Sequence, residues 1–291
     1  MINKNILVTV LVNCFNSERY ISECLTSLIN QSHYNLQIIV WDNQSYDNTS
    51  KIVKSFNDPR IHYYISGKFQ NLVEARINAL RHAQGDYIAI LDSDDIAHNN
   101  RIQDQLKIFL SDPEIGVVGG SVNYIDSKGQ YLKTKSFVSN NSILKQIIYY
   151  EFPFNNSTLM FRKLYFDLVK GYNLDFHYIN DYDIIYRISK ISKITNCKTI
   201  LSSNRLHYDN LSKRDFIFMQ NELFSFLKKI QLKTPNRRLF NLNFWSQFKC
   251  LLRLSKYLFN QRLLTQAFYQ LSLIFKLLII FVLYNIKYQK Q

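Results

Sequence analysis

Hydrophobic residues in the first hundred positions form short continuous runs, separated by polar turns and by stretches with apolar residues at helical spacing. Four runs rich in β-branched and aromatic residues predict buried strands: residues 6–12, 36–41, 61–65 and 87–91. The stretches between them place apolar side chains three or four positions apart, as in Ile21, Leu25 and Leu28, and these predict helices. Strands that alternate with helices of this length predict a mostly parallel α/β sheet with helices on both faces.

The pattern changes after residue 100, where the regular alternation of strand and helix stops. Two runs around the turn at 126–129 predict a hairpin and hence a small antiparallel sheet. The other predicted elements are helices at 99–110 and 140–150, a strand at 159–162 and a helix from Asn180 onward. We expect one domain over residues 1–215, with halves 1–100 and 101–215, followed by a helical region over 216–291.

The most informative stretch is 85–95, in which a glycine and an apolar strand lead into Asp92, Asp94 and Asp95. The carboxyl end of such a strand is where open α/β sheets bind their ligands. Crowded carboxylates repel one another, and a divalent cation relieves that repulsion. The stretch therefore predicts a site for a metal ion and a diphosphate. The alternative is a solvated acidic loop that precedes the helix near Asn99.

Three further acidic residues, at two other places in the chain, are candidates for binding or catalysis. Asp42 ends the second predicted strand, where a carboxylate can accept hydrogen bonds from a base or ribose, although Asp42 taken alone is explained by an ordinary turn. Asp181 and Asp183 open a predicted helix, whose dipole stabilises a carboxylate there, and Asp181 as a simple N-cap is the alternative. No G-x-G-x-x-G follows the first strand and no P-loop signature occurs, which argues against a dinucleotide oxidoreductase and a P-loop ATPase.

Charge separates the C-terminal quarter from the rest. Residues 223–291 contain twelve Lys and Arg and no Asp or Glu, whereas residues 1–222 have a balance of only +2 (24 basic against 22 acidic). Basic residues alternate there with Leu, Phe, Trp and Tyr, as in helices that lie in the interface of anionic membranes. The apolar run 271–284 is interrupted by Lys276 and is shorter than the roughly 20 residues of a span, which favours an interfacial anchor. We expect 236–291 to bind an anionic membrane surface, and no nucleic acid.

The cysteines and the N-terminus bear on location. Four cysteines are scattered without C-x-x-C spacing, which argues against a zinc site or a disulfide framework. The first residues lead directly into a strand, so no signal peptide is expected. We expect a cytoplasmic protein bound peripherally to the inner face of the plasma membrane.

Seven motifs in order make residues 5–215 resemble family 2 of the glycosyltransferases, which have the GT-A fold. They are the strand end at 11–16, the D-N-x-S-x-D-x-T loop at 41–49, the helix motif at 74–78, the D-x-D segment at 85–95, the strand at 156–162, the acidic motif at 180–183 and the closing segment at 205–212. Three positions depart from the family pattern: Asn13 stands for Pro, Asn156 for His and Asn180 for Glu.

The resemblance implies roles for individual residues. Asp42 would bind the base or ribose, Asp92 the ribose, Asp94 with His207 a divalent ion (Mn²⁺ or Mg²⁺) on the diphosphate, and Asp181 would be the catalytic base, with Asp183 as its rival. Further contacts to the nucleotide sugar are expected from six residues: Asn13, Phe15, Asn16, Asn43, Arg76 and Ser93. A purely structural role for His207 is the alternative.

The same resemblance implies a function. It is the inverting, metal-dependent transfer of a sugar from a nucleoside-diphosphate sugar, most simply a UDP-sugar, to a hydroxyl of a glycan or lipid-linked acceptor, in surface polysaccharide or glycolipid synthesis. One alternative is a sugar-nucleotide nucleotidyltransferase, which would need a Gly-rich first loop that residues 13–17 lack. The other is a non-catalytic membrane-bound scaffold, for which Asn180 is the best argument.

Overall fold

The computed structural model describes residues 5–210, 214–231, 237–260, 263, 266–267, 270–275 and 277–278. The chain forms two compact units, one of Met1–Leu144 with Pro153–Tyr208 and one of Lys145–Phe152 with Asp209–Gln291. Part of the predicted segment 271–284 lies outside the described residues. Ser212 of the closing motif lies outside them as well.

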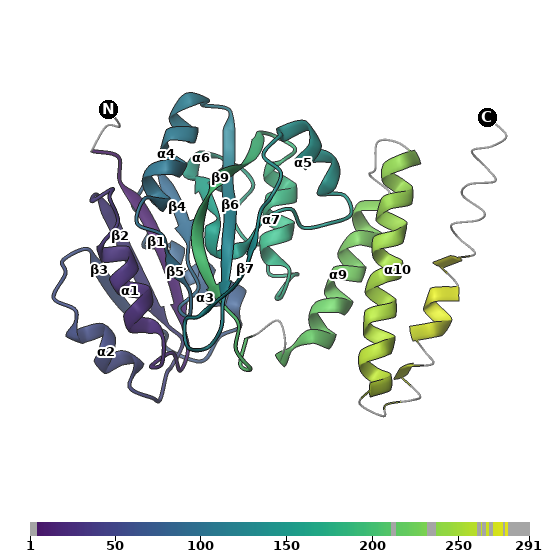
Figure 1. The fold of residues 1–291 in the computed structure, drawn as a ribbon, viewed down its shortest axis with the longest axis horizontal. Coiled ribbons are helices and arrows are strands. Elements are labelled where there is room, and N and C mark those ends of the chain that lie inside the picture. The colour runs from purple at the N-terminus through teal and green to yellow at the C-terminus, as the bar shows by residue number, and fades with distance from the viewer. Residues whose placement is uncertain are drawn as a thin grey trace. The chain divides into compact units, whose positions relative to one another are not determined.

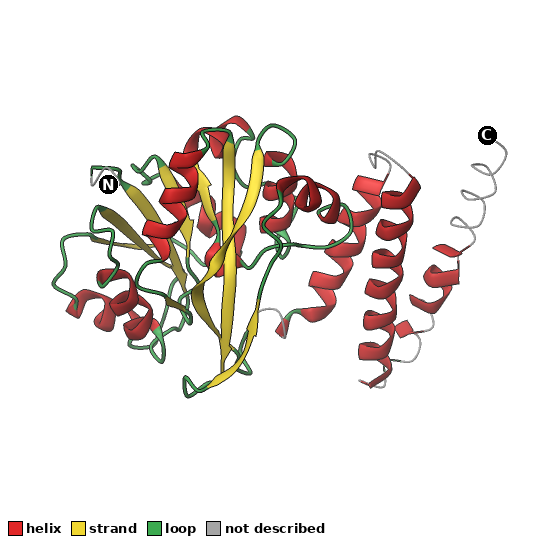
Figure 2. Cartoon of the chain, turned by 45° about the horizontal axis from the view of Figure 1, so that its top comes forward, coloured by secondary structure: helices red, strands yellow, loops and turns green. Residues whose placement is uncertain are grey.

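The first unit is built on a nine-stranded sheet in the order β3-β2-β1-β4-β8-β6-β9-β5, with β7 paired to β6 (Figures 1 and 2). Its strands are β1 (Val8–Cys14), β2 (Leu36–Asp42), β3 (Ile61–Ile65), β4 (Tyr87–Ile90), β5 (Ile96–Ala97), β6 (Ile115–Ile125), β7 (Tyr131–Lys135), β8 (Met160–Arg162) and β9 (Lys193–Arg205). Strands β1 to β4 are mutually parallel. Beyond β4 the sheet is mixed, because β8 is antiparallel to both β4 and β6. The sheet is thus the predicted α/β sheet with an antiparallel part on one side.

Helices cover both faces of this sheet. They are α1 (Ile21–Ile29), α2 (Thr49–Ser55), α3 (Leu72–Leu80), α4 (Arg101–Ser111), α6 (Lys163–Leu168) and α7 (Asn180–Ile188), with a 3₁₀ turn η1 at Asn156–Thr158; α5 (Asn141–Ile147) continues into the second unit. One face packs Val10, Ile38 and Ala89 against apolar residues of α1 and α4. Because alternate strand residues face opposite ways, Leu11 and Ile39 point to the other face, where α3 packs on β1 and β2. Both faces are therefore buried, as the continuous apolar runs predict.

The differences from prediction lie where local signals are weak. Helix α1 begins at Ile21, and the Ser17 carbonyl accepts hydrogen bonds from the backbone N–H groups of Tyr20 and Ile21, each at 3.0 Å. Strand β9 was not predicted, because its sequence mixes apolar, polar and charged residues along 13 positions. It is held by β6, with which it runs parallel from Ile115 to Ile125.

The second unit is helical in its described part. It contains α9 (Phe216–Gln231) and α10 (Arg237–Asn260), and Phe244 and Leu251 of α10 form a small core with Ile274 and Leu277. Within the described ranges, no helix has the length and apolar character that crossing a bilayer requires.

Candidate active site

Three loops meet at one edge of the sheet, because β1, β2 and β4 run parallel and end there. Hydrogen bonds join these loops directly. The backbone N–H of Asn16 donates to Ser45 Oγ at 2.9 Å, and the hydroxyls of Ser17 and Ser93 are 2.9 Å apart. Residues that are 76 positions apart in the chain are therefore in contact at the rim of the sheet.

Asp42 and Asn43 shape the loop after β2. Asp42 is buried, and its carboxylate accepts hydrogen bonds from the Ser45 N–H at 2.8 Å and from the Tyr63 hydroxyl at 2.5 Å. Burial, together with the bond to Asp42, raises the pKa of Tyr63. The Asn43 amide exchanges two hydrogen bonds, at 2.7 and 2.9 Å, with the backbone of Gln70. Both predicted ligands are thus engaged in holding the loop, and their contact with a nucleotide stays a prediction.

An aromatic patch lies next to this loop. The ring of Phe15 contacts Tyr46 and Phe69 edge-on, at centroid distances of 6.0 and 5.0 Å. Their exposed fractions are 38%, 84% and 62%, so large aromatic surfaces face solvent beside the strand ends. Sequence analysis named Phe15 alone. Tyr46 and Phe69 were missed, since nothing in their local sequence separates them from ordinary loop residues.

Backbone strain occurs in the same loops. Asn16 and Gln44 have φ angles of 50° and 68°, in the left-handed region that non-glycine residues rarely adopt. Such strain is typical of functional sites that the surrounding structure holds in place. Asn13, at the end of β1, has a buried side-chain nitrogen without a hydrogen-bond partner among the described residues. The donor of this side chain is therefore unused in the structure.

Asp92 is the first carboxylate of the D-x-D loop and remains accessible, with 43% of its side chain exposed. Asn156 Nδ2 donates to both of its carboxylate oxygens at 2.8 Å, and the Ser157 hydroxyl donates to one of them at 3.1 Å. Partial removal from water raises the pKa of Asp92, against the opposing effect of the Arg76 guanidinium. Asn156, one of the departures from the family pattern, thus orients the carboxylate predicted to bind the ribose.

Asp94 and His207 form the candidate metal pair. The His207 Nε2 lies 2.8 Å from Asp94 Oδ2, although the two residues are 113 positions apart. Among the described residues no group of three or more His, Cys, Asp and Glu side chains gathers to hold an ion. Mg²⁺ characteristically uses one or two carboxylates and takes its other ligands from substrate phosphates, and imidazole suits the softer transition metals. The pair therefore fits a divalent ion whose remaining ligands come from a diphosphate.

Asp95 links the D-x-D loop to β9, the strand that precedes His207. It was not predicted as a site residue. Its buried carboxylate accepts hydrogen bonds from the Arg205 N–H at 2.7 Å and from Asn204 Nδ2 at 2.5 Å. Burial, reinforced by Asp94 and Asp92, raises the pKa of Asp95 well above its ordinary value. The end of β9 is thereby fixed to the D-x-D loop, and His207 follows two residues later.

Arg76 joins the D-x-D loop to helix α7. Its guanidinium is buried, donates to Asp181 Oδ2 at 2.8 Å and lies 3.8 Å from Asp92 Oδ1. It also donates to the side chain of Asn180. Burial lowers the pKa of Arg76, but the nearby Asp181 and Asp92 carboxylates outweigh it, so the pKa is raised. Arg76, which was predicted to contact the nucleotide sugar, thus lies against both carboxylates and holds them in position.

Asp181 and Asp183 have different surroundings. Asp181 lies beside Asp92 and Arg76, accepts a further hydrogen bond from the Tyr172 hydroxyl at 3.1 Å and keeps 15% of its side chain exposed. Asp183 is paired with Arg187 at 2.7 Å, one turn along the same helix, and is 8% exposed. Only Asp181 is connected to the donor-side carboxylates.

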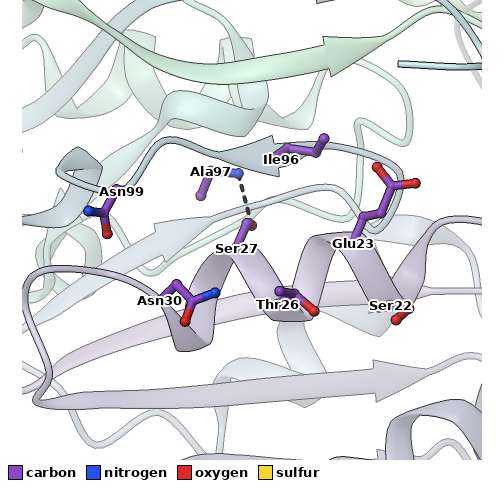
Figure 3. A pocket seen from close by; sticks show the side chains of 8 residues that line it. All are labelled: Ser22, Glu23, Thr26, Ser27, Asn30, Ile96, Ala97 and Asn99. Atoms are coloured by element: carbon purple, nitrogen blue, oxygen red, sulfur yellow. Dashed lines mark hydrogen bonds between the residues drawn. The ribbon is translucent and has the colours of Figure 1, made fainter.

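A separate surface pocket of about 530 Å³ lies along α1 and β5 (Figure 3). It is lined by Ser22, Glu23, Thr26, Ser27, Asn30, Ile96, Ala97 and Asn99, and the Ala97 N–H donates to Ser27 Oγ at 3.0 Å across it. No predicted site residue lines it. Its link to the site is Glu23, which pairs with Arg205 at 2.8 Å, and Arg205 Nε donates to the Asp94 carbonyl at 3.0 Å.

Comparison with known proteins decides the family. The model described as "Glycosyl transferase family 2" matches residues 9–167, more than half of the chain. The chain belongs to this family. It is a family 2 glycosyltransferase, which argues against the nucleotidyltransferase alternative.

Relatives agree with this assignment. The UDP-Glc:alpha-D-GlcNAc-diphosphoundecaprenol beta-1,3-glucosyltransferase of Escherichia coli is 29% identical over 219 residues, which cover 72% of this glycosyltransferase and 81% of the relative. The structure of S. aureus TarS in complex with UDP-GlcNAc superposes with a TM-score of 0.64 at 17% identity, covering 84% of this chain and 72% of that one. A mannosyltransferase of Pyrobaculum calidifontis in complex with GDP-Man and Mn²⁺ gives 0.62 at 16%, covering 93% and 86%. These likenesses confirm the predicted fold class.

Proposed function

We propose that this glycosyltransferase moves a sugar from a UDP-sugar to a hydroxyl group of a glycan or lipid-linked acceptor, with inversion at the anomeric carbon and with a divalent ion. The donor class is supported by the UDP-Glc in the name of the Escherichia coli relative and by the UDP-GlcNAc complex of a structural neighbour. The acceptor class is supported by the same relative, whose name specifies a diphosphoundecaprenol-linked sugar. Surface polysaccharide or glycolipid synthesis would then be the purpose of the reaction.

One observation carries the proposal: the buried Arg76 guanidinium lies between Asp92 and Asp181, at 3.8 and 2.8 Å. A residue of the donor-binding loop and a residue of the α7 helix start are held at a fixed separation. Single-displacement transfer needs the donor and the base to be positioned together around one anomeric carbon, and this contact supports such positioning.

The proposed reaction is a single displacement in which Asp181 acts as the base. An Asp181 oxygen accepts the proton of the acceptor hydroxyl as that oxygen bonds to the anomeric carbon. The bond from the same carbon to the diphosphate oxygen breaks, and the electron pair leaves with the nucleoside diphosphate. Arg76 and Tyr172 fix the orientation of the Asp181 carboxylate, with hydrogen bonds of 2.8 and 3.1 Å. One displacement of this kind inverts the anomeric centre.

The donor would be held by groups of the three loops. Asp94 and His207 would hold the divalent ion, whose positive charge, when bound, stabilises the negative charge that develops on the departing diphosphate. Asp92, with 43% of its side chain exposed and oriented by Asn156, is suited to accept hydrogen bonds from ribose hydroxyls. The patch of Phe15 and Tyr46 offers exposed rings for the base, since aromatic side chains stack on planar groups.

A thermal-unfolding screen of nucleotide sugars, in Mn²⁺ and in EDTA, tests the proposal. A donor present at about a hundred times its dissociation constant stabilises the folded chain by about 2.7 kcal/mol, which raises Tm by several degrees. We expect a UDP-sugar to do so in Mn²⁺ and much less in EDTA. A failure of every nucleotide sugar in Mn²⁺ contradicts donor binding, and an equal shift in EDTA contradicts the role of the metal.

A further inference from the structure

Helix α10 has two distinct faces. Residues spaced three and four apart are buried within the second unit: Phe244, Gln247, Leu251, Leu254 and Leu258. Phe244 and Leu251 pack with Ile274 and Leu277, while Leu254 and Leu258 pack with Ala267. This apolar stripe accounts for the helix as a structural element. On the other side of the helix, Trp245 packs edge-on against Phe244 and Phe248, at centroid distances of 5.5 and 5.4 Å, while part of its ring stays exposed.

The opposite face combines large apolar and basic side chains. Trp245 and Leu252 are 46% and 42% exposed, and Lys249, Arg253 and Lys256 are exposed beside them. At 3.6 residues per turn these five side chains fall within an arc of about 100°. We call them the basic-aromatic stripe.

Charge on this part of the chain is of one sign. Residues 223–291 contain twelve Lys and Arg and no Asp or Glu, so their own sequence supplies no carboxylate to the stripe. A second copy of the chain docking stripe to stripe would bring like charges together, which is unfavourable. An anionic surface is favoured instead.

We propose that the basic-aromatic stripe of α10 binds the surface of a membrane containing anionic lipids. Trp prefers the headgroup region, where its indole is half in apolar surroundings and half in water. Lys and Arg extend their charged ends to lipid phosphates while their carbon chains cover apolar surface. The stripe lies along the helix, so the helix axis is parallel to the membrane plane. This inference is independent of the proposed glycosyl transfer.

The chain contains its own probe for this contact. It has two tryptophans, Trp41 and Trp245, and Trp41 is buried in β2 of the first unit. In the full-length W41F variant, all indole fluorescence comes from Trp245. Vesicles of phosphatidylcholine and phosphatidylglycerol in equal parts are added to this variant. We expect the Trp245 emission to shift to shorter wavelength, and to be quenched when the vesicles contain brominated lipid. Pure phosphatidylcholine vesicles should have little effect.

Charge variants in the W41F background test the basic residues. Each basic residue near an anionic surface strengthens binding about fivefold, so K249Q/R253Q/K256Q should bind about a hundredfold more weakly. The matched control K51Q/K170Q/K198Q removes three exposed lysines from the first unit and should bind as W41F does.

Three results overturn the proposal. They are no fluorescence change of W41F on anionic vesicles, equal weakening by the control, and a change of Trp245 emission that depends on protein concentration without vesicles. The last result would show that a second copy covers the stripe. Stabilisation of K249Q/R253Q/K256Q by nucleotide sugar is compared with that of W41F, and it stays the same whether or not the stripe binds the membrane.

Discussion

Replacing Asp181 by Asn tests the assignment of the catalytic base most directly. The change keeps the shape of the side chain and removes its ability to take up a proton at neutral pH. The remaining side-chain oxygen can still accept the hydrogen bond that Arg76 donates at 2.8 Å, and the new NH₂ group can donate to the Tyr172 hydroxyl, 3.1 Å from the present carboxylate. The geometry of the site is therefore expected to survive.

The expected loss follows from what is removed. General base catalysis typically contributes about 10² to 10⁴-fold to the rate, so kcat should fall by at least a hundredfold. Arg76 keeps its charge but loses the Asp181 carboxylate as a partner, and losing one partner of a buried ion pair costs about 3–5 kcal/mol of folding stability. Donor binding should be nearly unchanged, because Asp94, His207 and the exposed part of Asp92 are untouched.

Turnover is measured as the release of UDP from the sugar donor that the thermal screen identifies. The assay is run with a panel of acceptors and also without acceptor, where water hydrolyses the donor. Asp183→Asn is the matched control. It lies two residues away, is similarly buried and is paired with Arg187 at 2.7 Å. We expect it to lower Tm through the lost ion pair while leaving kcat close to that of the parent chain.

The ranking of the two variants decides the question. A larger loss of kcat for Asp183→Asn would move the base to Asp183. Near-parental turnover in both variants would place the base outside α7. If both lose turnover together with donor binding, the site has been disturbed and the assignment loses its support.

Three further predictions concern the neighbouring groups. Asp94→Asn should abolish the extra stabilisation by UDP-sugar that Mn²⁺ brings, leaving the shift seen in EDTA, and calorimetry in the two conditions checks this. Arg76→Lys should lower kcat about a hundredfold with a smaller change in donor affinity, since an ammonium cannot bridge both carboxylates as the planar guanidinium does; unchanged kcat contradicts the positioning role. Burial lowers the pKa of His98 from its ordinary value of 6.5. The unfolded chain therefore takes up this proton at a higher pH than the folded chain does, so the free energy of unfolding decreases as the pH falls below about 6.5. His98→Gln, which retains a donor for the 2.9 Å contact with Ser203, should flatten the fall of Tm between about pH 7 and about pH 5, relative to the parent.

The parallel half of the fold follows from its sequence because each element carries its own signal. Strand β3 was predicted with its observed bounds, Ile61–Ile65, and β4 falls within the predicted 87–91. Helix α3 begins after Asn71, whose side chain accepts from the Glu74 N–H in a capping box, and the sequence shows both residues. The predicted hairpin is also present, since β6 and β7 pair antiparallel around the turn.

Long-range polar contacts could not be predicted in the same way. Asp95 and Arg205 are 110 positions apart, and Arg76 and Asp181 are 105 apart. Each looks locally like an ordinary turn or helix residue, and only the closure of the sheet brings them together. The sequence therefore predicted several of the carboxylates that meet at the candidate site, but not Asp95 and not the cations and amides that contact them. Asn156 shows the same limit, because its bidentate contact with Asp92 depends on the 3₁₀ turn η1.

The burial of Arg76 has a consequence for how the two halves of the site behave together. Carboxylates next to a buried guanidinium compensate its charge, and removing one partner of such an ion pair typically costs about 3–5 kcal/mol. Here the compensation comes from two elements, Asp181 of α7 at 2.8 Å and Asp92 of the D-x-D loop at 3.8 Å. If either element moved away, the other would be left to offset the charge alone. Asp181, the proposed base, and Asp92, the proposed donor-binding carboxylate, are therefore held together by the electrostatics of the fold.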